Sequence, residues 1–207
     1  MALTAVSVLA MADTNPFFDY KNWKTPHGTY PFSDIRTEHY LPAFEEGMRQ
    51  GLKEIDDIVN NPAAPTFENT IEAYEKTGEL LTIVEGCFYN LTNADTNDEL
   101  QELEMQLVPK MSDYSSSILL NEKLFARIKA VYDQKDKLKL NAEQRKMLDD
   151  IYEGFANNGA NLSPADKQKY KELSAKLSQL TTQFGQNALQ ATNAWFMQVS
   201  REEDLAG

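Results

Sequence analysis

The chain has 207 residues, of which 42% are hydrophobic and 10% aromatic, so it is able to bury a core and does not resemble a disordered segment. Its 32 acidic and 20 basic residues give a formal net charge of -12, which opposes binding to nucleic-acid phosphates and to anionic lipid surfaces. A single cysteine, Cys87, excludes an intrachain disulfide and a cysteine-based zinc site, and no apolar run reaches the roughly 18 residues of a membrane-spanning helix.

Residues 1–12 are uncharged and apolar and end with the small residues Ala10 and Ala12. This pattern is similar to the end of a secretory signal peptide with an A-x-A cleavage site, although the basic leading region of such peptides is missing. An unstructured terminus is the alternative. We favour the remnant of a signal peptide and expect a periplasmic location, with the cytoplasm as the alternative.

Residues 13–36 combine three prolines and Gly28 with six aromatic residues. This composition predicts an extended aromatic arm whose rings are buried against neighbouring helices. A ligand-binding surface is the alternative. The aromatic residues are Phe17, Phe18, Tyr20, Trp23, Tyr30 and Phe32.

Residues 37–207 are predicted to form a helical domain. Thr37 is the expected N-cap of its first helix, which ends near residues 60–62. Thr66 is the expected N-cap of a second helix that continues through Gly78, where a neighbouring backbone can approach closely. The polar residues around Thr66 therefore indicate a helix start, with a binding site as the alternative.

Further helix starts follow along the chain. Thr96 and Glu99 have the spacing of a capping box, and Pro109 is expected to kink the helix that they begin. Asn121 and Asn141 are the expected N-caps of two shorter helices, and residues 157–161 end the second of these.

The last helix has the clearest signals, with Ser163 as N-cap and Pro164 at the first helical position. Its apolar residues recur at alternating spacings of three and four, which is typical of a coiled coil or of a helix in a bundle. About six helices emerge in total, and no segment alternates convincingly with period two. The fold class is therefore all-α, a multi-helix bundle.

The sequence offers no recognisable catalytic or metal-binding constellation. His27 and His39 are the two histidines, and neither belongs to the H-E-x-x-H pattern of helical zinc hydrolases. There is no G-x-S-x-G elbow and no phosphate-binding glycine loop. Adjacent acidic pairs such as Asp149 and Asp150 point in different directions on a helix and indicate solvated faces. We therefore assign no catalytic, cofactor-binding or metal-binding residue.

Several blocks of the chain resemble the amino-terminal part of the thimet oligopeptidase-like zinc metallopeptidases, in particular the dipeptidyl carboxypeptidase and oligopeptidase A branch. The blocks are EHYLPAFEEGM at 38–48, PTFENTIEAYEKTGELL at 65–81, FYNLTNADTNDELQ at 88–101, VPKMSDYSSSILLNEKLFARIKAVYD at 108–133 and NNGANLSPADKQKYKELSAKLSQLTTQFGQNALQATNAW at 157–195. The resemblance covers nearly the whole chain, from about residue 15 onward.

The resemblance implies that the chain is one lobe of a larger, two-lobed helical enzyme whose channel admits short unfolded peptides. It implies zinc on an H-E-x-x-H helix of a catalytic lobe that this sequence does not include, so this segment alone is expected to bind no zinc and to hydrolyse no peptide. These helices would wall the channel of a peptidyl-dipeptidase. The alternatives are an endo-acting oligopeptidase of the same family and a stand-alone, non-catalytic helical binding module.

Overall fold

The computed structural model describes residues 15–201 and residue 203. The proposed signal-peptide remnant at residues 1–12 lies outside them. The described residues are mainly helical and contain no strand, which confirms the all-α prediction. The α-helices are α2 (Thr37–Val59), α3 (Ala73–Glu75), α4 (Glu79–Ala94), α5 (Asp98–Leu119), α6 (Glu122–Tyr132), α7 (Ala142–Phe155) and α8 (Pro164–Ala194), accompanied by 3-10 helices η1 (Pro16–Asn22) and η2 (Pro26–Gly28) and π-helical segments η3 (Phe67–Glu72) and η4 (Ala156–Ala160).

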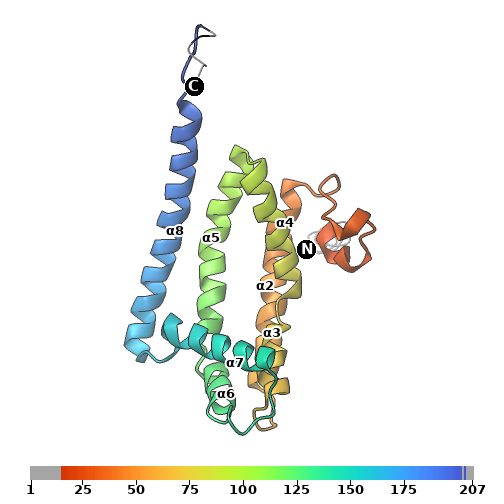
Figure 1. The fold of residues 1–207 in the computed structure, drawn as a ribbon, viewed down its shortest axis with the longest axis vertical. Coiled ribbons are helices and arrows are strands. Elements are labelled where there is room, and N and C mark those ends of the chain that lie inside the picture. Colours follow the sequence, from red (N-terminus) through yellow and green to blue (C-terminus); the bar gives the residue numbers. More distant parts are fainter. Residues whose placement is uncertain (1–14, 202, 204–207) are drawn as a thin grey trace, which may run out of the picture.

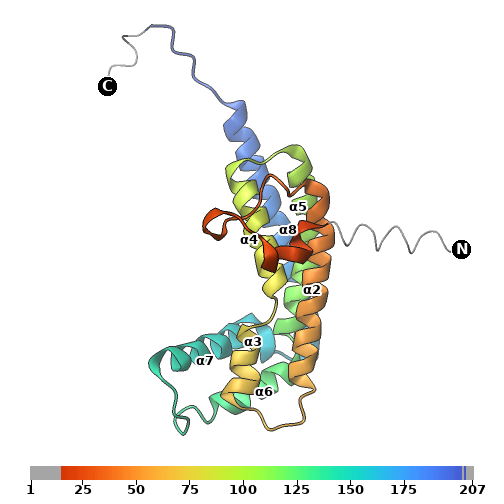
Figure 2. The ribbon, with the colours of Figure 1, turned by 90° about the vertical axis from the view of Figure 1, so that its right-hand side faces the viewer.

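The long helices lie side by side, as Figures 1 and 2 show. Helix α2 packs against α4 and α5, and α5 packs in turn against α8. Helices α6 and α7 and segment η3 close one end of the molecule. This order places α5 between α2 and α8, while α4 packs on α2.

Two apolar clusters stabilise this arrangement. One joins η1, α2, α4 and α5, and the other joins the lower part of α2 to η3, α6 and α7. Tyr114 of α5 packs against both clusters, and burial raises the pKa of its hydroxyl to about 12. The largest fully buried side chains are Tyr40, Phe17, Phe44, Phe88, Phe155, Ile55, Ile71, Leu107, Leu124, Ile128, Leu148 and Val84.

The aromatic segment before α2 is attached to the first cluster. Phe17 is fully buried, and its ring lies 5.4 Å from that of Tyr40 and 5.9 Å from that of Trp23, centroid to centroid. The Asn15 side-chain amide donates a hydrogen bond to the His39 carbonyl over 2.8 Å. These contacts hold the described start of the chain against the first turn of α2.

Four predicted helix starts are confirmed by their cap hydrogen bonds, in which a side-chain oxygen accepts a backbone N–H. The first start is at Thr66, which caps the segment that begins with η3. The Asn69 side chain accepts the Thr66 N–H in return, so the polar cluster around Thr66 is a helix start. The bonds run from Asn69 N to Thr66 Oγ1 (3.1 Å), from Leu124 N to Asn121 Oδ1 (3.0 Å), from Gln144 N to Asn141 Oδ1 (2.8 Å) and from Asp166 N to Ser163 Oγ (3.2 Å).

Two predicted N-caps are wrong by one residue. Thr37 is the first residue of α2, where the ring nitrogen Nδ1 of His39 accepts the Arg36 N–H over 3.0 Å. Asn97, and not Thr96, caps α5, because its side chain accepts the Leu100 N–H over 2.9 Å. The Thr96 hydroxyl is instead buried without a hydrogen-bond partner among the described residues.

The predicted second helix is broken at Gly78. Gly78 has a φ of 76°, a left-handed conformation that suits glycine, and its N–H donates to the Glu54 carboxylate over 2.8 Å. The predicted close approach of a neighbouring backbone occurs at Gly47 of α2 instead. A Cβ there would lie 2.9 Å from the Cα and the N of Leu81.

Helix α8 has the predicted start, but its apolar stripe is not packed against the rest of the molecule. It turns polar and small residues such as Ser174, Ala175 and Ser178 toward α5, while no residue of α8 is buried. Leu173, Leu177, Leu180 and Phe184 are exposed by 58%, 66%, 57% and 73%. No helix in the described part of the chain is long and apolar enough to cross a membrane.

Candidate functional site

The two histidines do not form a metal site with other residues. His27 is exposed in η2, and His39 uses Nδ1 to cap α2. Within residues 15–201 and 203, no group of three or more His, Cys, Asp and Glu side chains is arranged to hold a metal ion. Cys87 is fully buried, and its sulfur lies 3.4 Å from the Tyr40 hydroxyl.

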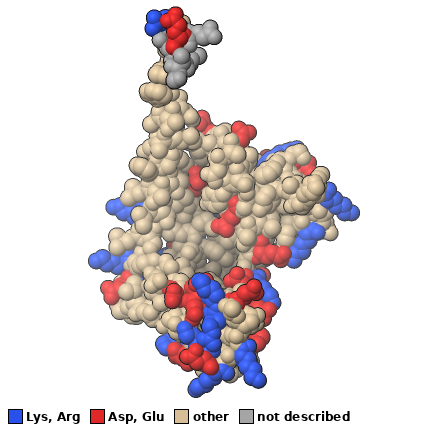
Figure 3. Space-filling view, in the orientation of Figure 1, with Lys and Arg blue, Asp and Glu red and all other residues tan. Residues whose placement is uncertain are grey.

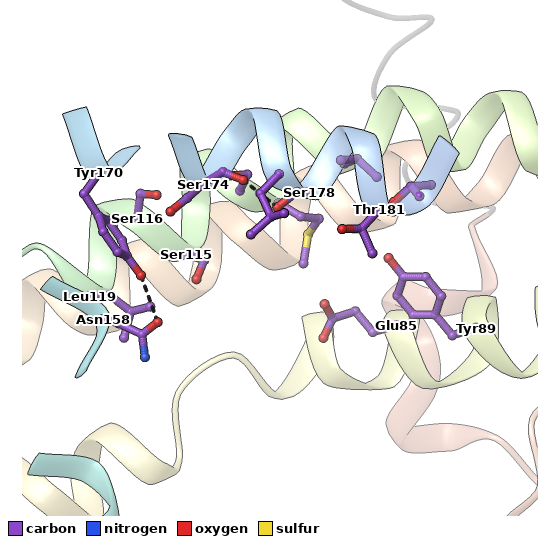
Figure 4. A pocket seen from close by; sticks show the side chains of 15 residues that line it. Glu85, Tyr89, Ser115, Ser116, Leu119, Asn158, Tyr170, Ser174, Ser178 and Thr181 are labelled. Carbon is purple, nitrogen blue, oxygen red and sulfur yellow. Dashed lines mark hydrogen bonds between the residues drawn. The ribbon is translucent and has the colours of Figure 1, made fainter. Parts of the chain in front are cut away.

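The candidate site is a groove of about 680 Å³ between α4, α5 and α8, which Figure 4 shows from close by. Its size lies within the range of roughly 300–1,000 Å³ that is usual for ligand pockets. Helix α5 forms its floor, and α4 and α8 form its two walls. Seven serine and threonine side chains line it: Ser112, Ser115, Ser116, Ser174, Ser178, Thr181 and Thr182.

Helical spacing places these hydroxyls on the facing sides of α5 and α8. Ser112, Ser115 and Ser116 are three and four residues apart on α5, and Ser174, Ser178 and Thr181 repeat this spacing on α8. The Ser178 hydroxyl donates to the Ser174 carbonyl over 3.0 Å, a bond made within the helix. The groove is therefore lined by groups that both donate and accept hydrogen bonds.

One end of the groove is closed by the turn before α8. The Tyr170 hydroxyl donates to the Asn158 side chain over 3.1 Å, and Asn158 donates to the Gly154 carbonyl over 2.8 Å. Gly159 has a φ of 92° and lies close to Leu162 and Leu120. This turn, which the sequence predicts as a helix end, fixes the direction in which α8 leaves.

The groove has one charged lining residue, Glu85 of α4. Its carboxylate is half-buried, and desolvation raises its pKa above the usual range for glutamate. No hydrogen bond or ion pair joins it to another residue in the described ranges. Figure 4 shows Glu85 and Tyr89 projecting from α4 toward the hydroxyls of α8.

Charged side chains gather elsewhere on the view in Figure 3, chiefly where α6 and α7 lie, whereas the face along α8 is mostly uncharged. Many of these charges form surface pairs such as Lys135 with Asp149 (2.7 Å) and Lys129 with Asp133 (2.7 Å). Adjacent acidic residues do not act together: Asp149 pairs with Lys135, and Asp150 pairs with Lys146. They are part of the solvated surface, as predicted.

Sequence reasoning missed the groove. The serine run at 112–117 is visible in the sequence, but its role depends on α8, more than fifty residues later. Glu85 carries no signal of its own, because it is one of many acidic residues on predicted helices. The available signal was the polar face of α8, whose hydroxyls recur with the period of a helix.

No family model matches the chain, but curated proteins do. It is 40% identical over 199 residues to dipeptidyl carboxypeptidase of Escherichia coli K12 and 41% identical over 194 residues to its Salmonella typhimurium counterpart. These alignments cover 95% and 94% of the chain. It is also 29% identical over 194 residues to oligopeptidase A of E. coli. The chain belongs to the thimet oligopeptidase family.

The chain spans 29% of the length of the E. coli dipeptidyl carboxypeptidase and 28% of that of oligopeptidase A. Most of the length of these members of the thimet oligopeptidase family thus has no counterpart in this sequence. The family membership confirms the predicted resemblance and supports a peptidase family for this chain.

Proposed function

We propose that the chain is the amino-terminal helical segment of a zinc-dependent peptidyl-dipeptidase that hydrolyses oligopeptides, and that its groove forms part of the wall of the substrate channel. The observation that carries this proposal is the 40% identity to a dipeptidyl carboxypeptidase across 95% of the chain. An endo-acting oligopeptidase is the second candidate, and the lower identity of 29% to oligopeptidase A makes it the weaker one.

The chemistry of the groove supports a role in peptide binding. An unfolded peptide presents backbone N–H and C=O groups that need partners, and hydroxyls such as those of Ser115 and Thr181 serve either kind. The groove also has apolar surface from residues such as Met111 and Leu119, against which peptide side chains can pack. Substrate would therefore be held through its backbone, with little dependence on its sequence.

The described residues do not fit a zinc site, since no suitable group of ligands is found among them. We assign the zinc of the proposed enzyme to the part of the protein that corresponds to the remaining length of its relatives. Zinc there would polarise a water molecule and the scissile carbonyl. The role of this segment would be to enclose and orient the peptide.

The exposed stripe of α8 supports a role as one lobe of a larger protein. A surface helix normally turns its apolar face toward the core, but α8 turns its polar face toward α5 and presents four large apolar side chains outward. We propose that the catalytic lobe packs on this stripe, which comprises Leu173, Leu177, Leu180 and Phe184.

The proposal can be tested by replacing the matched 199-residue segment of E. coli dipeptidyl carboxypeptidase with the corresponding part of this chain. The chimera should release dipeptides from the carboxyl end of an oligopeptide, lose activity on chelation and regain it with zinc. Ser115→Trp, which fills the groove, should lower kcat/KM for an eight-residue peptide by about tenfold if binding contacts worth roughly 1.4 kcal/mol are lost. A folded chimera without zinc-dependent activity would contradict the proposal.

A further inference from the structure

We propose that Glu85 makes the groove a recognition site for a cationic group of a bound peptide, either its terminal ammonium group or a lysine or arginine side chain. The inference rests on the proposed peptide-binding function and deepens it, because it names a chemical preference among substrates. The shared chemistry is a positively charged nitrogen that donates hydrogen bonds to the Glu85 carboxylate.

The position of Glu85 is the first observation. Two further hollows, of about 400 Å³ and about 520 Å³, adjoin the groove, and Glu85 lines all three. The first of these is lined by Tyr74, Gly78 and Tyr114 among others, and the second lies along the outer turns of α4. A ligand that follows the groove therefore meets this carboxylate at the junction of the three hollows.

The charge of the lining is the second observation. Glu75 and Glu85 are the charged residues that line the three hollows, and no lysine or arginine is among the lining residues. Lys171, which belongs to the same turn of α8 as Tyr170, forms an ion pair with Asp113 outside the groove. A cation that enters the groove thus meets negative charge and hydroxyl oxygens without a competing positive charge.

The environment of Glu85 is the third observation. Its carboxylate is half-buried beside Tyr89 and bonds to no other described residue, although most carboxylates that are withdrawn from water have a partner. Burial raises its pKa, which reflects the cost of holding an unpaired charge there. A cationic ligand would supply the missing partner, and the hydroxyls of α8 opposite would bind its neighbouring backbone groups.

The test uses the 207-residue chain, labelled with nitrogen-15, and titrations followed by NMR with four five-residue peptides. The first is pentaalanine amide with a free terminal amine, and the second is its acetylated form. The third and fourth are acetylated and carry a central lysine or its uncharged analogue norleucine. In one of the two pairs, we expect the cationic peptide to bind about fivefold more tightly than its uncharged partner. Its binding should shift the NMR signals of residues around Glu85.

The pair that shows the difference identifies the source of the cation. Glu85→Gln keeps the shape of the side chain and should reduce the preference to less than about twofold, as expected when a single charge pair is removed. Glu153→Gln, on the exposed side of α7, removes the same charge elsewhere and should leave the preference unchanged. The spectra of both variants report whether the fold is intact.

Equal affinities within both pairs would overturn the inference, and so would a preference that persists in Glu85→Gln or the absence of any binding near Glu85. These results are distinct from failure of the proposed function. An active chimera whose groove binds charged and uncharged peptides equally would retain the peptidase function and refute the role of Glu85.

Discussion

Asparagine side chains begin three successive helices of this protein. The Oδ1 atoms of Asn97, Asn121 and Asn141 accept a backbone N–H three residues later, over 2.9, 3.0 and 2.8 Å. Each bond satisfies a donor that has no partner within its helix. Because this requirement is local, the sequence is sufficient to predict such positions to within one residue.

Residues 96 and 97 offer a direct comparison of two candidate caps. Asn97→Ala should lower the free energy of unfolding by about 1 kcal/mol, the usual cost of losing an N-cap. Thr96→Val should leave it unchanged or raise it slightly, because the buried Thr96 hydroxyl has no partner to lose. Urea unfolding followed by circular dichroism measures both. If Thr96→Val lowered the free energy of unfolding by more than Asn97→Ala does, Thr96 and not Asn97 would be the N-cap.

At the scale of helices, the crossing of α2 and α4 depends on a missing side chain. At Gly47 a Cβ would meet backbone atoms of Leu81 at 2.9 Å, a distance that real Cβ contacts almost never show. One of the two helices would have to move. Gly51, one turn further along α2, faces the Tyr114 hydroxyl in a similar way.

Gly47→Ala should therefore destabilise the protein by about 1–3 kcal/mol, the usual cost of overpacking a core. Gly154→Ala in α7 is the matched control, because a Cβ there would meet nothing within 4 Å apart from its chain neighbours and the nearby backbone of its own helix. It should stabilise the protein by up to roughly 1 kcal/mol through the better helix propensity of alanine. Thermal unfolding distinguishes the two variants, and equal effects would argue against a tight crossing at Gly47.

The elements show which features a sequence can predict and which it cannot. The helix starts at Asn121, Asn141 and Ser163 depend on neighbours in the chain and were predictable. The break at Gly78 depends partly on Glu54, which is 24 residues away. An apolar stripe continues across the break, so the periodic pattern predicted an uninterrupted helix. The groove needs the relative placement of α4, α5 and α8, which no local pattern contains.

At the scale of the whole molecule, the distribution of apolar surface is uneven. Two clusters bury the apolar faces of α2 to α7, whereas the apolar stripe of α8 remains exposed. The stripe contributes no described core contact, so its replacement should not affect the stability of the isolated chain. It should affect association, because contiguous exposed apolar surface binds other apolar surfaces.

Leu173, Leu180 and Phe184 changed together to glutamine should reduce the fluorescence of an apolar dye and shift sedimentation toward the monomer. The free energy of unfolding should stay within about 0.5 kcal/mol per substitution, as is usual for exposed sites. Ile128→Ala, in the buried cluster, should instead cost about 2–5 kcal/mol. Unchanged dye fluorescence in the triple variant would show that the exposed stripe does not attract apolar molecules.

The unequal lengths of α5 and α8 have a mechanical consequence. Gln186 of α8 already reaches the first turns of α5, where its amide donates to the Gln101 carbonyl over 3.2 Å. The residues of α8 after Gln186 extend beyond α5 as a free arm. The whole of α8 is about 46 Å long, at 1.5 Å for each of its 31 residues. A force applied to that arm is resisted first at Gln186, whose amide bonds the Gln101 carbonyl and the Glu104 carboxylate, so these two contacts are the nearest restraint on the free end of α8.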